Sequence, residues 1–229
     1  MDFLHVSASF GIFISLLGFL IGGLIKSFLK SKSFNPLLFT IIFVISALTL
    51  FGIDYDTYAK SADFLGYLLT PATICLAVPL YERRELVRRN FPAIAVGIFM
   101  GVFSSAVSVW ALSLLFGFSH VQYVTFLPKS ITTAIGMGIS EELGGMPNLT
   151  AVSIIITGII GNIAATPLFR LLKIEDPIAV GIAIGSSSHA MGTVRAMEIG
   201  ETEGAMSGLA IALAGLLTVA AAPLFAFFL

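Results

Sequence analysis

The sequence predicts an all-α polytopic membrane protein, and three observations support this fold class. Hydrophobic residues make up 57% of the 229 residues, charged residues only 11%, and the mean hydropathy is +1.02. A soluble domain carries about 25% charged residues, which keep its surface hydrated. Several apolar stretches also reach the length of about 20 residues that a helix needs to cross a bilayer. We therefore expect lipid to surround most of the chain.

About six stretches fit full membrane spans. They are residues 10–29, 36–53, 64–81, 92–116, 149–171 and 204–229. The third contains Pro71 and Pro79 and is expected to be kinked, because proline removes a helical hydrogen bond. Basic residues gather at 26–32 and 83–89, whereas the loop at 54–63 is acidic. By the positive-inside rule, the basic loops are cytoplasmic and the N-terminus is outside, in a multi-pass protein of the plasma (inner) membrane.

Two stretches, residues 121–146 and 176–203, are interrupted by Gly, Ser, Thr and charged residues. Each is either a re-entrant hairpin or a broken spanning helix. Hairpins are favoured, because they would place Arg170 and Lys173 on the cytoplasmic side. Non-helical backbone at membrane depth persists only where protein or a water-filled cavity surrounds it.

The two interrupted stretches also resemble one another at an offset of 56 residues. The matched pairs include Gly136 with Gly192, Glu142 with Glu198, and Pro167 with Pro223. We therefore divide a single transmembrane domain, 1–229, into scaffold spans (1–120), a first hairpin-plus-span repeat (121–176) and a second, inverted repeat (177–229). Inverted repeats with interrupted helices mark the central site of secondary transporters. The alternative is a glycine-rich face for helix packing.

Polar residues within the two breaks are the candidates for substrate binding. A restarting helix presents free N–H groups and a positive dipole end, which together attract a carboxylate or phosphate oxygen. The candidates are Lys129, Ser130, Thr132, Thr133, Ser187, Ser188, His189 and Arg195. Supporting roles fall to Asn162, Thr193 and Glu198.

Three of these candidates have a structural alternative. Lys129 either binds an anion or snorkels and caps a partner helix. Arg195 either contacts substrate or forms a local ion pair with Glu198, three residues on. His189 is suited to a proton relay, because histidine titrates near neutral pH, or to a structural hydrogen bond. By contrast, Ser104 and Ser113 lie on an ordinary span and are expected to matter little.

Several classes of function are excluded. The net charge of −1 disfavours a nucleic-acid partner. Cys75 is the only cysteine, which excludes an internal disulfide. Ser188 and His189 are adjacent, so on a helix they point about 100° apart and cannot form a nucleophile–base pair. No metalloprotease or phosphate-loop motif is present, and we expect no catalysis, no cofactor and no metal site.

Four runs of this sequence resemble the LrgB/CidB family, which includes YohK-type proteins and the C-terminal half of the plant plastidic glycolate/glycerate translocator. The runs are LTPATICLAVPLY at 69–81, LPKSITTAIGM at 127–137, GGMPNLTA at 144–151 and GSSSHAMGTVRAMEIGETEGAMSGLA at 185–210. The family usually has proline where this chain has Ala134, and often threonine where it has Ser186.

This resemblance implies two functions of different classes. One is transport of small monocarboxylates such as glycolate, glycerate or pyruvate, often with a separate LrgA/CidA-type membrane partner. The other is an antiholin-like modulator of murein hydrolase export and autolysis. The paired polar breaks favour the carrier, and the glycine-rich spans favour a homo-oligomer.

Overall fold

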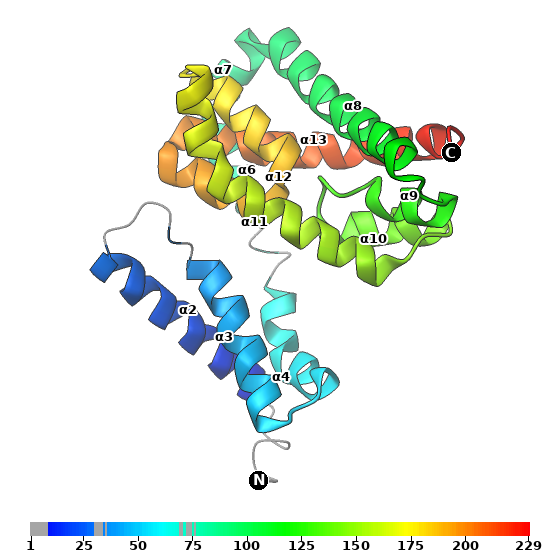
Figure 1. Ribbon diagram of the computed structural model, residues 1–229. Coiled ribbons are helices and arrows are strands. Elements are labelled where there is room, and N and C mark those ends of the chain that lie inside the picture. Colours follow the sequence, from blue (N-terminus) through cyan, green and yellow to red (C-terminus); the bar gives the residue numbers. More distant parts are fainter. Residues whose placement is uncertain (1–8, 30–33, 35, 69–70, 72–74, 76) are drawn as a thin grey trace. The chain divides into compact units, whose positions relative to one another are not determined.

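The computed structural model describes residues 9–29, 34, 36–68, 71, 75 and 77–229, and every regular element within them is helical (Figure 1). The contacts gather in two compact units, Met1–Cys75 and Leu76–Leu229. This boundary falls inside the stretch that we assigned to scaffold spans. The division of the chain into a scaffold and two repeats stays a prediction.

Among its described residues, the first unit contains α2 (Phe10–Leu29), α3 (Pro36–Phe51) and α4 (Tyr55–Tyr67), with α2 packed against both of the others. The backbone N–H of Gly11 donates to Ser61 Oγ at 2.9 Å, which a Cβ at Gly11 would prevent. Asp54 caps α4 by accepting a hydrogen bond from the Thr57 N–H at 2.9 Å.

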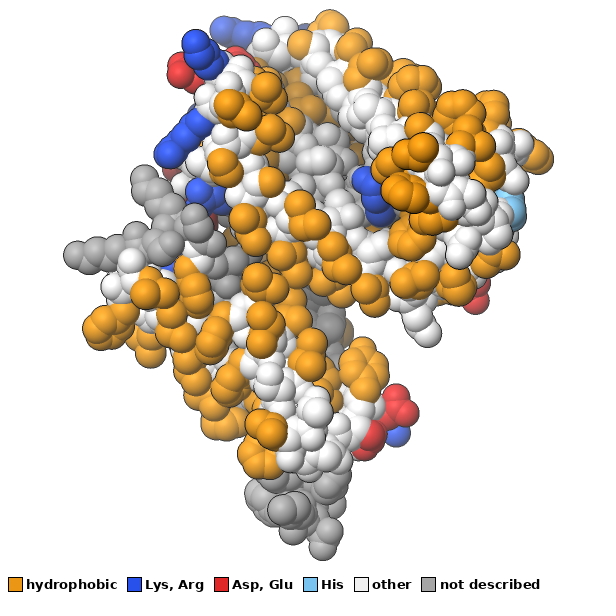
Figure 2. All heavy atoms as spheres, in the orientation of Figure 1, with side chains coloured by type: hydrophobic (Ala, Val, Ile, Leu, Met, Phe, Trp, Pro, Cys, Tyr) orange, Lys and Arg blue, Asp and Glu red, His pale blue; other side chains and the backbone are white. Residues whose placement is uncertain are grey.

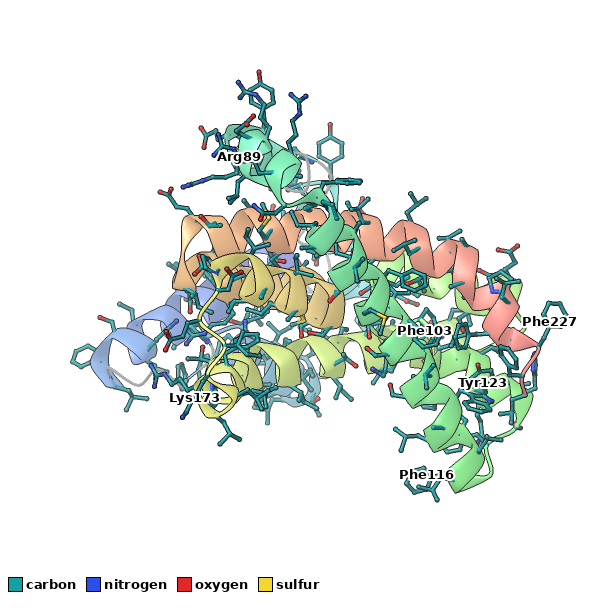
Figure 3. All side chains as sticks on the ribbon, turned by 90° about the horizontal axis from the view of Figure 1, so that it is seen from above. Arg89, Phe103, Phe116, Tyr123, Lys173 and Phe227 are labelled. Carbon is teal, nitrogen blue, oxygen red and sulfur yellow. The ribbon has the colours of Figure 1, made fainter. Side chains whose placement is uncertain are left out.

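The second unit contains the remaining helices. In chain order they are α6 (Ala77–Glu82), α7 (Arg84–Arg89), α8 (Phe91–Phe116), α9 (His120–Phe126), α10 (Thr133–Glu142), α11 (Pro147–Leu172), α12 (Pro177–Ile199) and α13 (Glu201–Ala226). The most extensive packing is between α12 and α13, where Gly181 and Gly185 lie directly on the backbone of α13. Figure 3 shows α8 crossing α12 and α13 diagonally, from Arg89 just before its start to Phe116 at its end.

Within the described residues, four helices are long and apolar enough to cross a membrane: α2, α8, α11 and α13. They coincide with four of the predicted spans. The apolar α3 corresponds to a fifth but has only 16 residues. The predicted third span, 64–81, falls partly in α4 and partly in α6, and its residues 69–70, 72–74 and 76 lie outside the described part. The predicted kink there is therefore not placed.

At the first interrupted stretch the chain doubles back. Residues 127–132 form the turn between α9 and α10, a segment that we call tip 1. After α10, the Met146 N–H donates to Thr125 Oγ1 at 2.9 Å, so the chain returns to the C-terminal end of α9. Thr150 Oγ1 joins the two helices, 2.9 Å from the Thr125 carbonyl and 2.7 Å from Ser140 Oγ. This is the geometry of a hairpin.

The second interrupted stretch also doubles back, within α12. His189 has φ 42° and ψ −143°, which breaks the helix into a first arm (residues 177–188) and a second arm (residues 190–199). Residues eight apart in a straight helix are about 12 Å apart along its axis. A Cβ on Gly192, however, would lie 3.2 Å from the Ile184 carbonyl oxygen. Val180, Ile184 and Ala196 also share one core cluster. The arms therefore pack against one another, and their junction, residues 186–189, is tip 2.

Candidate binding cleft

A cleft of about 1010 Å³ opens in the second unit, between α8, tip 1, α11 and the first arm of α12. Figure 2 shows this hollow, with a basic side chain at its wall. Both hairpin tips contribute to the lining: Lys129 and Ser130 come from tip 1, and residues 186–188 come from tip 2. The two interrupted stretches thus meet at one place, although their tips are almost 60 residues apart in the chain.

Tip 1 is fixed to α8 by a hydroxyl pair. Ser130 Oγ lies 2.7 Å from Ser105 Oγ, and the Lys129 ammonium group lies 3.5 Å from Ser130 Oγ. Pro128 is fully buried, which anchors the backbone just before the lysine. Within the described part of the chain, no carboxylate lies within ion-pairing distance of Lys129. The cleft therefore holds a half-buried cation whose observed partner is a hydroxyl group.

Tip 2 packs closely against α8 and α11 because both helices have a glycine at the point of contact. Ser188 packs directly on Gly161 of α11. A Cβ added at Gly161 would overlap the Ser188 hydroxyl. A Cβ on Gly101 of α8 would lie 2.6 Å from Ser186 Oγ. Ser187 donates to the Ala183 carbonyl at 2.6 Å and lies 3.0 Å from Ser188 Oγ. The result is a cluster of hydroxyls in the same cleft as Lys129.

Four predicted site residues do not line the cleft. Thr132 and Thr133 begin α10, and Thr132 makes no side-chain capping hydrogen bond. His189 is buried, with Nε2 2.9 Å from the Ile154 carbonyl oxygen, and its ring packs on Gly158 of α11. Because a carbonyl only accepts, this contact requires the proton on Nε2. The structural alternative for His189 matches this position.

Arg195 is the fourth residue outside the cleft. It forms the ion pair with Glu198 that its spacing suggested, at 2.6 Å. Its Nε and Nη2 also donate to Thr166 Oγ1 on α11, at 3.0 and 2.9 Å. Arg195 thus ties the second arm of α12 to α11.

The supporting residues hold the turn at tip 2. The Asn162 amide donates to the Met191 carbonyl at 2.8 Å, just beyond the break. Thr193 Oγ1 lies 3.1 Å from the His189 carbonyl and 2.7 Å from Ser207 Oγ of α13. The bonds from Asn162 and to Ser207 tie the start of the second arm of α12 to α11 and α13.

Sequence reasoning missed the wall formed by α8. Its lining residues include Ser104, Ser105 and Ser108, and we had expected Ser104 to lie on an ordinary span. The spacing did carry a signal, because Gly97, Gly101 and Ser105 recur every four residues and so lie on one helical face. The far end of the cleft is also polar and is marked by Asn90 and Asp176.

Long apolar helices, and a cleft lined by the tips of two hairpins, define a helical membrane protein. The chain belongs to the LrgB-like family, whose model matches residues 15–228. No solved structure matches the chain.

Proposed function

We propose that this protein is a carrier of small monocarboxylates of the glycolate, glycerate and pyruvate class, and that it binds the carboxylate between tip 1 and tip 2. One observation carries the proposal: within the described residues Lys129 has no carboxylate partner, and it lines a cleft beside hydroxyls from both tips. A charged side chain in a membrane segment costs several kcal/mol unless it is paired or hydrated. A substrate carboxylate supplies the missing negative charge.

The hydroxyl protons available to such a substrate can be counted from the hydrogen bonds. Ser187 uses its proton on the Ala183 carbonyl, so in the 3.0 Å pair Ser188 donates to Ser187 Oγ, and the protons of both serines are used within tip 2. In the pair of Ser105 and Ser130, one hydroxyl donates to the other and the second proton remains available. One hydroxyl donor and the remaining ammonium protons of Lys129 suit a carboxylate that carries a neighbouring hydroxyl or keto oxygen.

We further propose that the two hairpins are inverted copies within a six-span fold. The second halves of the copies support this. Both α11 and α13 have 26 residues, and their internal prolines, Pro167 and Pro223, correspond at the 56-residue offset. The first halves differ, because α9 has only seven residues whereas the first arm of α12 runs to Ser188. Tips that enter from opposite sides would suit alternating access.

The antiholin-like alternative needs apolar, oligomerising spans but has no use for a half-buried cation between two hairpin tips. We propose that any effect on autolysis is indirect, through organic-acid traffic. We also propose that the protein is a homo-oligomer of the plasma membrane with its N-terminus outside, that an LrgA/CidA-type partner assists it, and that it has no catalytic activity.

Counterflow of labelled glycolate and pyruvate into proteoliposomes of the purified full chain tests the carrier function. Wild type should exchange label, and Lys129→Gln should reduce exchange at least tenfold, because a hydrogen bond to a charged group is worth about 1.5–3 kcal/mol. Lys60→Gln, at an exposed lysine of α4, is the matched control and should exchange normally. Normal exchange by Lys129→Gln would exclude the proposed anion site. Repeating the assay with the partner present shows whether the partner is required.

A further inference from the structure

The cleft is much larger than a two- or three-carbon acid requires. At about 1010 Å³ it is at the upper end of the size range that encloses drug-sized ligands. The polar groups described above gather at the tips. A second part of the cleft, nearer the start of α8 and of α12, is lined by apolar or small residues of both helices.

The register of α8 against α12 shows how these two parts are arranged. A Cβ on Gly97 would lie 3.4 Å from Ile182, and one on Gly101 would lie 2.6 Å from Ser186, four residues further along both helices. The two helices therefore run in the same direction along the cleft. The hydroxyl groups lie at its tip end.

One or two turns back along the same helices, the wall of the cleft changes from hydroxyl-bearing to apolar and small residues. Ala93 and Gly97 of α8 line it, together with Ile178, Ile182 and the exposed Ala179 and Ala183 of α12. Asn90 and Asp176 follow at the far end, where the Asp176 side chain accepts from the Ala179 N–H at 2.8 Å. The cleft is thus divided into a cationic and hydroxylated head region, an apolar region about two helical turns long and a polar rim.

We propose that the cleft also binds medium-chain carboxylates, with the carboxylate at Lys129 and the unbranched alkyl tail along residues 178–183 of α12. The proposal rests on the proposed function, because it uses the same anion site. From Ser187 to Ala179 the first arm rises about 12 Å. An extended chain advances about 3.5 Å over three bonds, so this length accommodates a tail of roughly ten carbons. Longer tails would reach the carboxylate of Asp176, and their additional carbons would not increase the affinity.

Thermal unfolding of the full chain in nanodiscs, with acetate, butyrate, hexanoate, octanoate and decanoate as ligands, tests this proposal. A ligand that binds the folded state stabilises it by RT ln(1 + L/Kd), where L is the free ligand concentration, so at one concentration a tighter ligand raises the unfolding midpoint further. Each added methylene should strengthen apparent affinity about twofold to fourfold, levelling near ten carbons. Lys129→Gln should remove this stabilisation. Octan-1-ol, which has the tail without the charge, should stabilise wild type no more than it stabilises Lys129→Gln.

Two variants test where the tail lies, because each should limit the tail length that still increases affinity. Ala183→Leu narrows the apolar region one turn from Ser187, about 6 Å away, and should end the gain in affinity near five carbons. Ala179→Leu, one turn further, should end it at longer tails than Ala183→Leu does. Ala111→Leu, at an exposed alanine of α8 that does not line the cleft, should behave as wild type.

The outcomes separate this proposal from the one on which it rests. If acetate and glycolate stabilise the protein through Lys129 but tail length has no effect, the small-carboxylate site stands and the tail region is excluded. A gain with tail length that persists in Lys129→Gln or in Ala183→Leu would mean partition into the bilayer, and would also overturn the proposal. If no carboxylate stabilises the protein, both proposals fail.

Discussion

The hydroxyl groups of Ser105 and Ser130 lie 2.7 Å apart and join the middle of α8 to tip 1. This contact sets the position of Lys129, which directly precedes Ser130 in the chain. Ser105 lies on the same face of α8 as Gly97 and Gly101, the two glycines that admit α12. The position of the cation in the cleft therefore depends on a residue outside both hairpins.

Ser105→Ala should weaken substrate binding without preventing insertion. The substitution removes one neutral hydrogen bond, worth about 0.5–1.5 kcal/mol, so the substrate concentration for half-maximal flux should rise about 2- to 12-fold. Counterflow at several glycolate concentrations measures this. Ser153→Ala, which removes a hydroxyl from α11 outside the cleft, is the control and should leave the value unchanged. Equal effects from the two variants would show that the hydroxyl pair does not position Lys129.

The two neighbouring serines of tip 2 should differ in their effects. Ser187 is exposed in the cleft, and a substrate carboxylate can compete with the Ala183 carbonyl for its proton, so Ser187→Ala should raise half-saturation about 2- to 12-fold. Ser188 is buried and its proton is used on Ser187 Oγ, so Ser188→Ala should have the smaller effect. The ratio of the two half-saturation concentrations is the decisive measurement. A larger effect from Ser188→Ala would contradict this assignment of the protons.

Composition and apolar length were sufficient to predict the helical membrane fold and the positions of its four long helices, because lipid imposes one dominant constraint on each span. The sequence also singled out Lys129, Ser130, Ser187 and Ser188, which line one cleft, and their role in binding stays a prediction. Polar residues within long apolar stretches are easy to recognise in the sequence, even when they are far apart in the chain.

The rest of the candidate site depended on three-dimensional packing. Whether Arg195 faces the cleft or α11 depends on how the second arm folds back at His189, and local spacing does not contain that information. Ser104 was assigned to an ordinary span because it lies within the long apolar stretch 92–116. Ser104 does bond to the Gly101 carbonyl, at 3.0 Å, yet it also lines the cleft.

The proposed orientation can be tested with single cysteines in a Cys75→Ala background. Asp56→Cys, at an exposed position of α4, should react with an impermeant thiol reagent added outside intact cells. Arg88→Cys, at an exposed position of α7, should react only after the membrane is permeabilised. Labelling both before and after permeabilisation controls for buried sites. The reverse pattern would place the N-terminus inside.

Thr150→Val should loosen the base of the first hairpin. Thr150 Oγ1 is fully buried between Ser140 Oγ and the Thr125 carbonyl, and valine has nearly the same shape without the hydroxyl. Leaving these buried groups without their partner should cost about 1–3 kcal/mol, measured as a lower thermal unfolding midpoint. Thr49→Val removes an exposed hydroxyl from α3 and should change the midpoint little. Equal midpoints for the two variants would mean that this network contributes nothing to stability.

His189→Gln separates a structural histidine from a proton relay. Nε2 of His189 contacts the Ile154 carbonyl at 2.9 Å, the ring is buried against α11, and the residue does not line the cleft. We therefore expect the variant to unfold at a lower temperature, through the loss of about 0.5–1.5 kcal/mol for the hydrogen bond together with ring packing.

The pH profile of glycolate flux by His189→Gln should match that of wild type, because no proton path from the cleft through this ring is needed. Gly158→Ala is an independent check. A Cβ there would lie 2.6 Å from the ring Cε1, so this variant should lower the midpoint by the cost of overpacking, about 1–3 kcal/mol, again without altering the pH profile. A flattened profile in His189→Gln with an unchanged midpoint would reverse the assignment and make His189 a relay.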